Sequence, residues 1–249
     1  MESTTPAAKA NGLSTVTNTI AAPSDAFETL RVAPTWGWAC LIAIILMAIG
    51  SYLQGPATRH AGVVQTQRMM ATSSLFANFT PEQKQAAITR AGKASPFSYL
   101  FVIVTLFIVV FLNTLMTLIG NAIGKGQADF KRLWAGSMNI AVPTLGLGAI
   151  VLGIITMLRG PDAFNSSMDI ATAMPSLAYI LPHGSIVAAT FLAGFSIFTI
   201  WGLFLNATML RVTAKTSPGF AYGFAALITV LGALLATGLV SIAHNAGFA

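Results

Sequence analysis

The sequence has 249 residues, of which 55% are hydrophobic and only 8% are Asp, Glu, Lys or Arg. Soluble domains carry roughly 25% charged residues because water must hydrate their surface, so this composition excludes an ordinary soluble globule and indicates a protein surrounded by lipid. The net charge of +6 does not indicate a nucleic-acid-binding protein, because the basic residues are scattered in ones and twos between apolar runs. Cys40 is the only cysteine, which excludes an intramolecular disulfide and a metal cluster built on cysteines.

The N-terminal part of the chain divides into two segments. Residues 1–24 are rich in Ser, Thr and Ala and are predicted to form a disordered tail. Residues 25–38 are predicted to form a short helix at the level of the lipid headgroups, before the first span. Tryptophan favours that level because its ring is apolar and its N–H is polar. The residues expected to anchor this interfacial helix are Phe27, Pro34, Trp36 and Trp38.

Five long stretches of the chain contain no Asp, Glu, Lys or Arg. A helix needs about 20 mostly apolar residues to cross the ~30 Å hydrocarbon core of a bilayer. Because the stretches lack the strict alternation of barrel strands, the sequence predicts an all-α integral membrane protein. Residues 25–245 are expected to form one bundle of five transmembrane helices. The predicted spans are Trp36–Leu53, Phe97–Ile119, Met138–Leu158, Ile186–Leu210 and Phe220–Ile242.

The distribution of basic residues predicts the orientation of the bundle. Five spans place the two termini on opposite sides of the membrane. The two short connectors on the N-terminal side carry five basic residues, whereas the short connector on the other side carries only Arg159. Because short cytoplasmic loops are enriched in Lys and Arg, we expect a cytoplasmic N-terminus.

Two longer connectors carry structure of their own. In the first, residues 80–83 read Thr-Pro-Glu-Gln, which predicts a helix that begins with a capping box and ends near Gly92. In the second, residues 160–185 have an apolar series at helical spacing that Pro175 interrupts. That segment could lie at the interface or enter the bundle. Backbone that enters the bilayer must be buried in protein or line a cavity, which would indicate transport, whereas Asp162 and Asp169 favour the interface.

The predicted spans contain polar residues but no charges. Transporters coupled to protons or ions usually place charged residues at membrane depth, so their absence argues against coupled transport. Side-chain amides within a bundle more often join helices by hydrogen bonds, although they can also line a solute path. Pro143 removes a backbone donor and is expected to kink its helix. The candidate polar and packing residues are Asn113, Asn139, Pro143, Ser196, Trp201 and Asn206.

The sequence offers no recognisable set of catalytic residues. The three histidines, His60, His183 and His244, are far apart and are not spaced as metal ligands. A phosphate-binding loop, a dinucleotide fingerprint and a nucleophile elbow are absent from the sequence. We therefore expect no enzymatic activity, no metal and no cofactor.

Short motifs are distributed from residue 27 to residue 242. In chain order they are Phe-Glu-Thr-Leu at 27–30 with Pro34 and Trp36, Asn-Phe-Thr-Pro-Glu-Gln at 78–83, Phe-Lys-Arg-Leu at 130–133 with Met138, Asn139 and Pro143, Phe-Thr-Ile-Trp at 198–201 with Leu205, and Ala-Tyr at 221–222. With the five-span layout, they resemble the bacterial branch of the Yip domain family, which is named after Ypt/Rab-interacting proteins. The chain lacks the Asp-Leu-Tyr-Gly-Pro-like motif of eukaryotic members, and Ser196 stands where bacterial members often have Asp.

This resemblance implies a five-helix protein related to eukaryotic trafficking proteins that bind Rab GTPases and shape vesicle membranes. The missing motif argues against GTPase binding, and the bacterial-type motifs imply the inner (plasma) membrane of a bacterium. Our first functional hypothesis is a non-enzymatic scaffold or assembly partner that binds other membrane proteins or further copies of itself in the bilayer. The alternative is a permease or channel component for a small solute, with Asn113, Asn139 and Asn206 along a common path.

Overall fold

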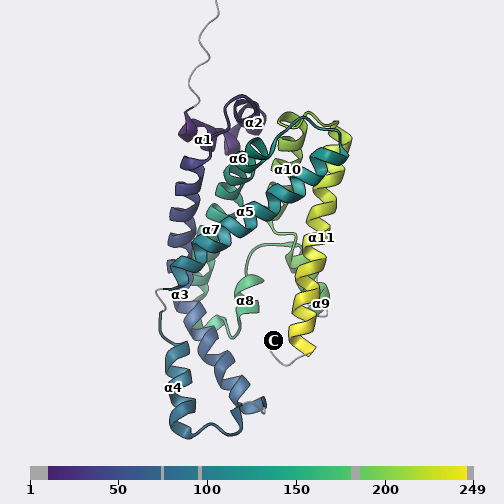
Figure 1. Ribbon diagram of the computed structural model, residues 1–249. Coiled ribbons are helices and arrows are strands. Elements are labelled where there is room, and N and C mark those ends of the chain that lie inside the picture. Colours follow the sequence, from purple (N-terminus) through teal and green to yellow (C-terminus); the bar gives the residue numbers. More distant parts are fainter. Residues whose placement is uncertain (1–10, 74–75, 95–96, 181–185, 246–249) are drawn as a thin grey trace, which may run out of the picture.

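The computed structural model describes residues 11–73, 76–94, 97–180 and 186–245, and every regular element in these ranges is a helix. Four helices are long and apolar enough to cross a membrane: Gly37–Thr72, Tyr99–Ile123, Phe130–Arg159 and Pro218–Ile242. They run along a common bundle, with two short N-terminal helices at one end and a helical arm at the other (Figure 1). The chain thus has the layout of a multi-pass membrane protein.

The N-terminal helices differ from the sequence prediction. Helix α1 spans Gly12–Ala21 and α2 spans Pro23–Val32, so most of the segment predicted as a disordered tail (1–24) is helical where the structure describes it. The Asn11 side chain caps α1 by accepting a hydrogen bond from the backbone of Leu13. Helix α1 buries Val16 and two threonines, and α2 buries Ala26, Phe27 and Leu30. This burial accounts for the order that the Ser/Thr-rich composition does not suggest.

The first long helix extends beyond the predicted span. Helix α3 (Gly37–Thr72) has 36 residues, which at ~1.5 Å per residue is about 54 Å, well over the ~30 Å hydrocarbon core. Its far half carries α4 (Pro81–Ala91), and the two form the arm in Figure 1. The predicted capping box of α4 is confirmed: Thr80 accepts from the Gln83 backbone, and the Gln83 side chain accepts from the Thr80 backbone.

The second and third long helices enclose the centre of the bundle. Helix α5 (Phe97–Ile123) crosses the bundle diagonally in Figure 1. The next span is continuous but changes register: α6 (Phe130–Ala141) leads into a π-helical turn, η2 (Val142–Leu147), and then α7 (Gly148–Arg159). The expected irregularity at Pro143 takes the form of this wider turn, because proline has no N–H for the regular helical hydrogen bond.

Small residues bring α3 and α7 close together. A side chain at Gly50 would overlap the backbone of Ala149, and a Cβ at Gly153 would lie 2.7 Å from the Cβ of Leu53. Gln54 joins the same helices, because its Nε2 donates to the carbonyl oxygen of Ala149 at 3.3 Å. Close backbone approach of this kind is the usual way in which membrane helices associate.

The predicted fourth span, Ile186–Leu210, is interrupted in the structure. It consists of α9 (Ile186–Ala193) and α10 (Ile197–Val212), separated at residues 194–196. Ser196 accounts for the restart, because its hydroxyl accepts a hydrogen bond from the Thr199 backbone at the N-terminus of α10. The last helix, α11 (Pro218–Asn245), packs against both α9 and α10.

The described part of the connector before α9, residues 160–180, contains three short helices, η3 (Pro161–Ala163), α8 (Ser167–Ala171) and η4 (Leu177–Ile180). It enters the bundle and pairs with the break in the fourth span. The backbone N–H of Leu177 donates to Phe195 O, and that of Ile197 donates to Pro175 O, both at 3.3 Å. The break therefore has partners for the backbone groups that an uninterrupted helix would satisfy internally.

Candidate functional site: an uncharged cavity within the bundle

A cavity of about 760 Å³ lies between α5, the α6–α7 span, α10 and α11. Its walls are mainly apolar, and among the described residues that line it none is charged. A volume in the range of roughly 300–1,000 Å³ is typical of small-molecule sites. The polar side chains that line the cavity are Gln54, Asn113, Ser137, Thr144, Ser196, Thr199, Asn206 and Thr229.

One hydrogen-bonded cluster on the cavity wall joins three helices. Asn113 of α5 donates from Nδ2 to Ser137 Oγ of α6 at 3.0 Å and to Asn206 Oδ1 of α10, also at 3.0 Å. Asn206 in turn donates from Nδ2 to the carbonyl oxygen of Gly202 at 2.9 Å. The cluster satisfies polar groups that would be costly to leave unpaired in an apolar environment.

The cluster also leaves hydrogen-bonding capacity unused. Asn113 lines the cavity, its Oδ1 accepts no hydrogen bond from any described residue, and this atom is not one of the fully enclosed unpaired atoms. The Ser137 hydroxyl accepts from Asn113, and its own hydrogen is donated to no described residue. Within this cluster, one acceptor and one donor are therefore not used by the described residues.

Irregular backbone borders the same cavity. Thr144 and Leu145 of the π-helical turn line it, as do Ser196 and Thr199 in the first turn of α10. The Ser196 and Thr199 hydroxyls are 2.9 Å apart. Turns of π-helix and interrupted membrane helices recur at functional sites, because both place polar backbone and side-chain groups beside a cavity.

The structure brings only some of the predicted residues together. Asn113, Asn206 and Ser196 line the cavity, whereas Asn139 lies apart from it. Asn139 is 1% exposed, and its Nδ2 donates to Thr35 O at 3.0 Å and to Ala135 O at 2.8 Å. Pro143 is buried in the π-helical turn, and Trp201 stacks on Phe204 with ring centroids 5.4 Å apart. The three amides therefore do not share one path.

The predicted interfacial anchors also separate into two kinds. Phe27 is completely buried and packs with Leu133 and Met209, so it is a core residue. Trp36 and Trp38 are 40% and 52% exposed, as an anchor at the membrane surface requires. Pro34 lies in the link between α2 and α3. Trp36 also contacts the ring of Trp134 edge-on, with centroids 6.3 Å apart.

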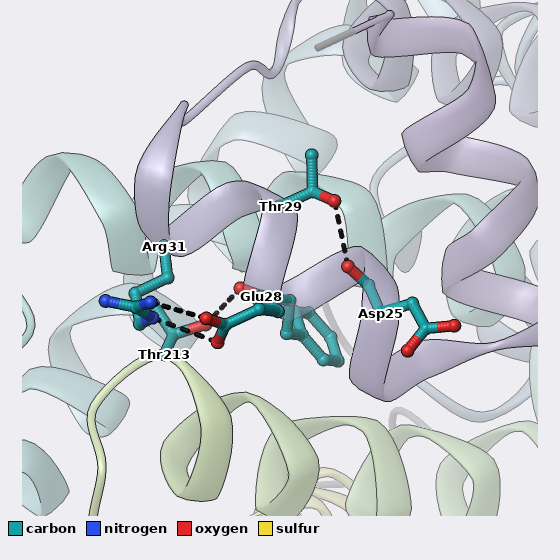
Figure 2. A network of polar contacts seen from close by, with 6 residues as sticks. Asp25, Glu28, Thr29, Arg31 and Thr213 are labelled. Atoms are coloured by element: carbon teal, nitrogen blue, oxygen red, sulfur yellow. Dashed lines mark hydrogen bonds and ion pairs between the residues drawn. The ribbon is translucent and has the colours of Figure 1, made fainter. Parts of the chain in front are cut away.

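Polar contacts gather where α2 meets the end of α10. Figure 2 shows the Glu28 carboxylate facing the Arg31 guanidinium, with Thr213 beneath the helix. Arg31 Nε donates to Glu28 Oε2 at 2.9 Å, and Thr213 Oγ1 donates to the carbonyl oxygen of Phe27 at 3.2 Å. The hydrogen bond from Arg31 lowers the pKa of Glu28 below its ordinary value. This network belongs to the helix packing and lies away from the cavity.

Sequence reasoning missed several lining residues, above all Ser137 and Thr199. A single hydroxyl in an apolar helix usually bonds to its own backbone, as Thr144 and Thr229 do here. Such residues give no signal in the sequence that they face a cavity. Among the described residues, no group of three or more His, Cys, Asp or Glu side chains is placed to hold a metal ion.

Comparison of the chain with protein-family models, with curated proteins and with solved structures found no match. The resemblance to the Yip domain family therefore stays a prediction from short motifs.

Proposed function

We propose that this multi-pass membrane protein is a permease component that binds an uncharged solute in the cavity between α5, α6–α7, α10 and α11. The observation that supports this function best is the Asn113–Ser137–Asn206 cluster on the wall of an otherwise apolar cavity. A small set of placed polar groups on an apolar surface is the usual composition of a ligand site. Asn113 and Asn206, two of the three amides in the permease hypothesis, belong to this cluster, whereas Asn139 does not.

The lining residues define the charge of the solute. A charged group within an apolar bundle is costly unless an opposite charge or a metal accompanies it. The described lining residues supply neither. The proposed solute is therefore neutral, and its passage is passive and independent of proton gradients and membrane potential.

The five-span topology belongs to the same proposal. In this view α9 and α10 together form the fourth crossing, α2 lies near the membrane surface, and the N-terminus is cytoplasmic in a bacterial inner membrane. Five basic residues in the two short connectors of the N-terminal side support this orientation. Reporter fusions to the two termini test it, because an odd number of crossings requires opposite signals from the two ends.

Osmotic swelling of proteoliposomes tests the permease function. Purified full-length protein is reconstituted, and stopped-flow light scattering follows the entry of urea, glycerol and larger uncharged polyols. Gly232 lines the cavity, and a Cβ added there meets nothing within 4 Å, so Gly232→Phe is chosen to narrow the cavity. Gly223 on the same helix is equally open but does not line the cavity, so Gly223→Phe is the matched control.

We expect at least one uncharged solute to enter faster than into empty liposomes, and Gly232→Phe to slow that entry while Gly223→Phe does not. Formate, which is charged, is expected to show no protein-dependent entry. Absence of entry for every solute, or equal effects of the two glycine substitutions, would contradict the proposal.

A scaffold is the second candidate function, and the arm formed by α3 and α4 favours it. Residues 55–93 contain five basic residues and a single acidic one, Glu82, and no residue of α4 is buried. Such a projecting basic surface suits an acidic partner. Purification in mild detergent followed by mass spectrometry tests this function. A stoichiometric partner that is lost in Arg90→Glu would support the scaffold, and retention of that partner would exclude the arm as its binding surface.

A further inference from the structure

The cavity lies beside a divergence between two membrane helices. The C-terminal end of α5 contacts the N-terminal end of α11, where the Phe224 ring covers Gly120 and the Phe220 ring covers Gly124. A Cβ added to either glycine would be 2.5 Å from the ring. Farther toward its C-terminus, α11 packs against the end of α9, where a Cβ at Gly194 would lie 2.8 Å from the Cβ of Ala233. Figure 1 shows α5 running away from α11 across the bundle.

The diverging parts of these two helices line the cavity. Val109, Leu112 and Met116 of α5 line it on one side, and Ile228, Gly232 and Ala236 of α11 line it on the other. Several of these side chains are open to the surroundings; Leu112 is 50% exposed and Met116 is 40% exposed. Both helices belong to the apolar set that is long enough to cross a membrane, so in a bilayer these side chains would meet lipid acyl chains.

We propose that the cavity opens sideways into the bilayer between α5 and α11, and that its ligand is a neutral lipid whose polar end carries a hydroxyl group. This inference rests on the proposed solute site and names the class of molecule that occupies it. The cavity is bordered between these helices by Val, Leu, Met and Ile side chains, which contact the acyl chains of a lipid without loss of hydrogen bonds.

The polar cluster matches a hydroxyl in particular. A hydroxyl group donates one hydrogen bond and accepts others, and the wall offers the unused acceptor Asn113 Oδ1 and the unused hydrogen of Ser137. Asn113 lies ten residues from Ile123, the end of the span, which is about 15 Å at ~1.5 Å per residue. Within the apolar span a lipid hydroxyl lacks water, and the cluster replaces the lost hydrogen bonds.

Charge supports the same class of lipid. A phosphate headgroup would bring at least one negative charge to a wall on which the described residues carry no cation. The desolvation of that charge would then go uncompensated. A diacylglycerol-type lipid has the apolar chains that suit the side opening and the uncharged hydroxyl that suits the cluster.

Photocrosslinking in nanodiscs tests this inference. Full-length protein is placed in phosphatidylcholine nanodiscs that contain a diazirine-labelled diacylglycerol or, in a parallel sample, the corresponding diazirine-labelled phosphatidic acid. Peptide mass spectrometry then locates the crosslinks. We expect diacylglycerol to label the cavity-facing residues of α5 and α11 more strongly than phosphatidic acid does, because phosphatidic acid meets these helices only from the surrounding bilayer. Gly232→Phe should reduce the labelling roughly tenfold, which corresponds to about 1.4 kcal/mol of binding free energy, while Gly223→Phe should not.

Three results would overturn the inference. They are equal labelling by the charged and the neutral lipid, equal labelling of the two glycine variants, and crosslinks confined to surfaces outside the cavity. If no lipid labels the cavity but urea or glycerol still enters liposomes in a manner that Gly232→Phe blocks, the lipid assignment fails and the solute site stands. If solute entry is absent as well, both fail.

Discussion

Substitution of Phe27 tests whether α2 packs into the core of the bundle or lies at the membrane surface. Its side chain is fully buried against Leu133 and Met209, and its Cε1 atom is 3.8 Å from a Cβ added at Gly136. Replacing a buried Phe by Ala removes apolar contacts and leaves a cavity, which typically costs about 3–5 kcal/mol of unfolding free energy. For a chain of this length, that loss corresponds to a fall in Tm of roughly 6–20 °C.

The measurement compares Phe27→Ala with Trp38→Ala in the same detergent, by thermal unfolding followed with size-exclusion chromatography. Trp38 is 52% exposed, and we expect its substitution to change the unfolding free energy by about 0.5 kcal/mol or less. If Phe27→Ala unfolds within 2 °C of the parent chain, α2 is not packed as described. The reasoning would also fail if Trp38→Ala were the more destabilising of the two.

Three further predictions concern helix contacts and charge. Gly50→Ala should destabilise the protein by about 1–3 kcal/mol, because the added Cβ overlaps the backbone of α7. Gly37→Ala should not, because a Cβ there meets nothing within 4 Å. Chemical unfolding in bicelles measures both variants. Asn113→Leu should cost about 0.6–2 kcal/mol in the same assay, since it removes two interhelical hydrogen bonds, and an unchanged value would refute the cluster. Arg31 lowers the pKa of Glu28, so the stability that this pair supplies is present above the ordinary carboxylate pKa and is lost as the pH falls through the lowered pKa. Glu28→Gln should remove this part of the pH dependence of Tm.

The sequence predicted the elements that depend on local patterns. Four of the five charge-free stretches correspond to the four long helices, and the Thr-Pro-Glu-Gln run predicted both hydrogen bonds of the α4 capping box. These signals are local, because span length and helix capping depend on residues within one helix.

The break in the predicted fourth span depended on contacts between distant residues. Residues 186–210 contain no charge and no proline, so an unbroken helix was the expected structure. The interruption is stabilised by backbone pairing with residues 175–177 and by the Ser196 cap. Backbone pairing across the bundle leaves no mark in the hydropathy of either segment.

The candidate site was also predicted only in part from the sequence. Composition indicated an uncharged interior, and the intramembrane amides were identified from sequence. Their separation into a cavity cluster around Asn113 and an isolated Asn139 was not, because it depends on how α5, α6 and α10 rotate about their axes. For the same reason Phe27 was taken as an anchor, since an apolar side chain on a short helix suits lipid and a protein core equally well.

Thiol accessibility tests the central claim, an accessible cavity inside the bundle, most directly. In a Cys40→Ala background, single cysteines replace Thr229, which lines the cavity, and Thr208, which is 1% exposed and does not line it; both threonines bond only to their own helix. Reconstituted protein is treated with a small uncharged thiol reagent, and modification is followed by mass spectrometry. The account predicts that Thr229→Cys reacts and Thr208→Cys does not, and that Gly232→Phe slows the reaction at position 229. Equal protection of the two cysteines would contradict the cavity and the function proposed for it.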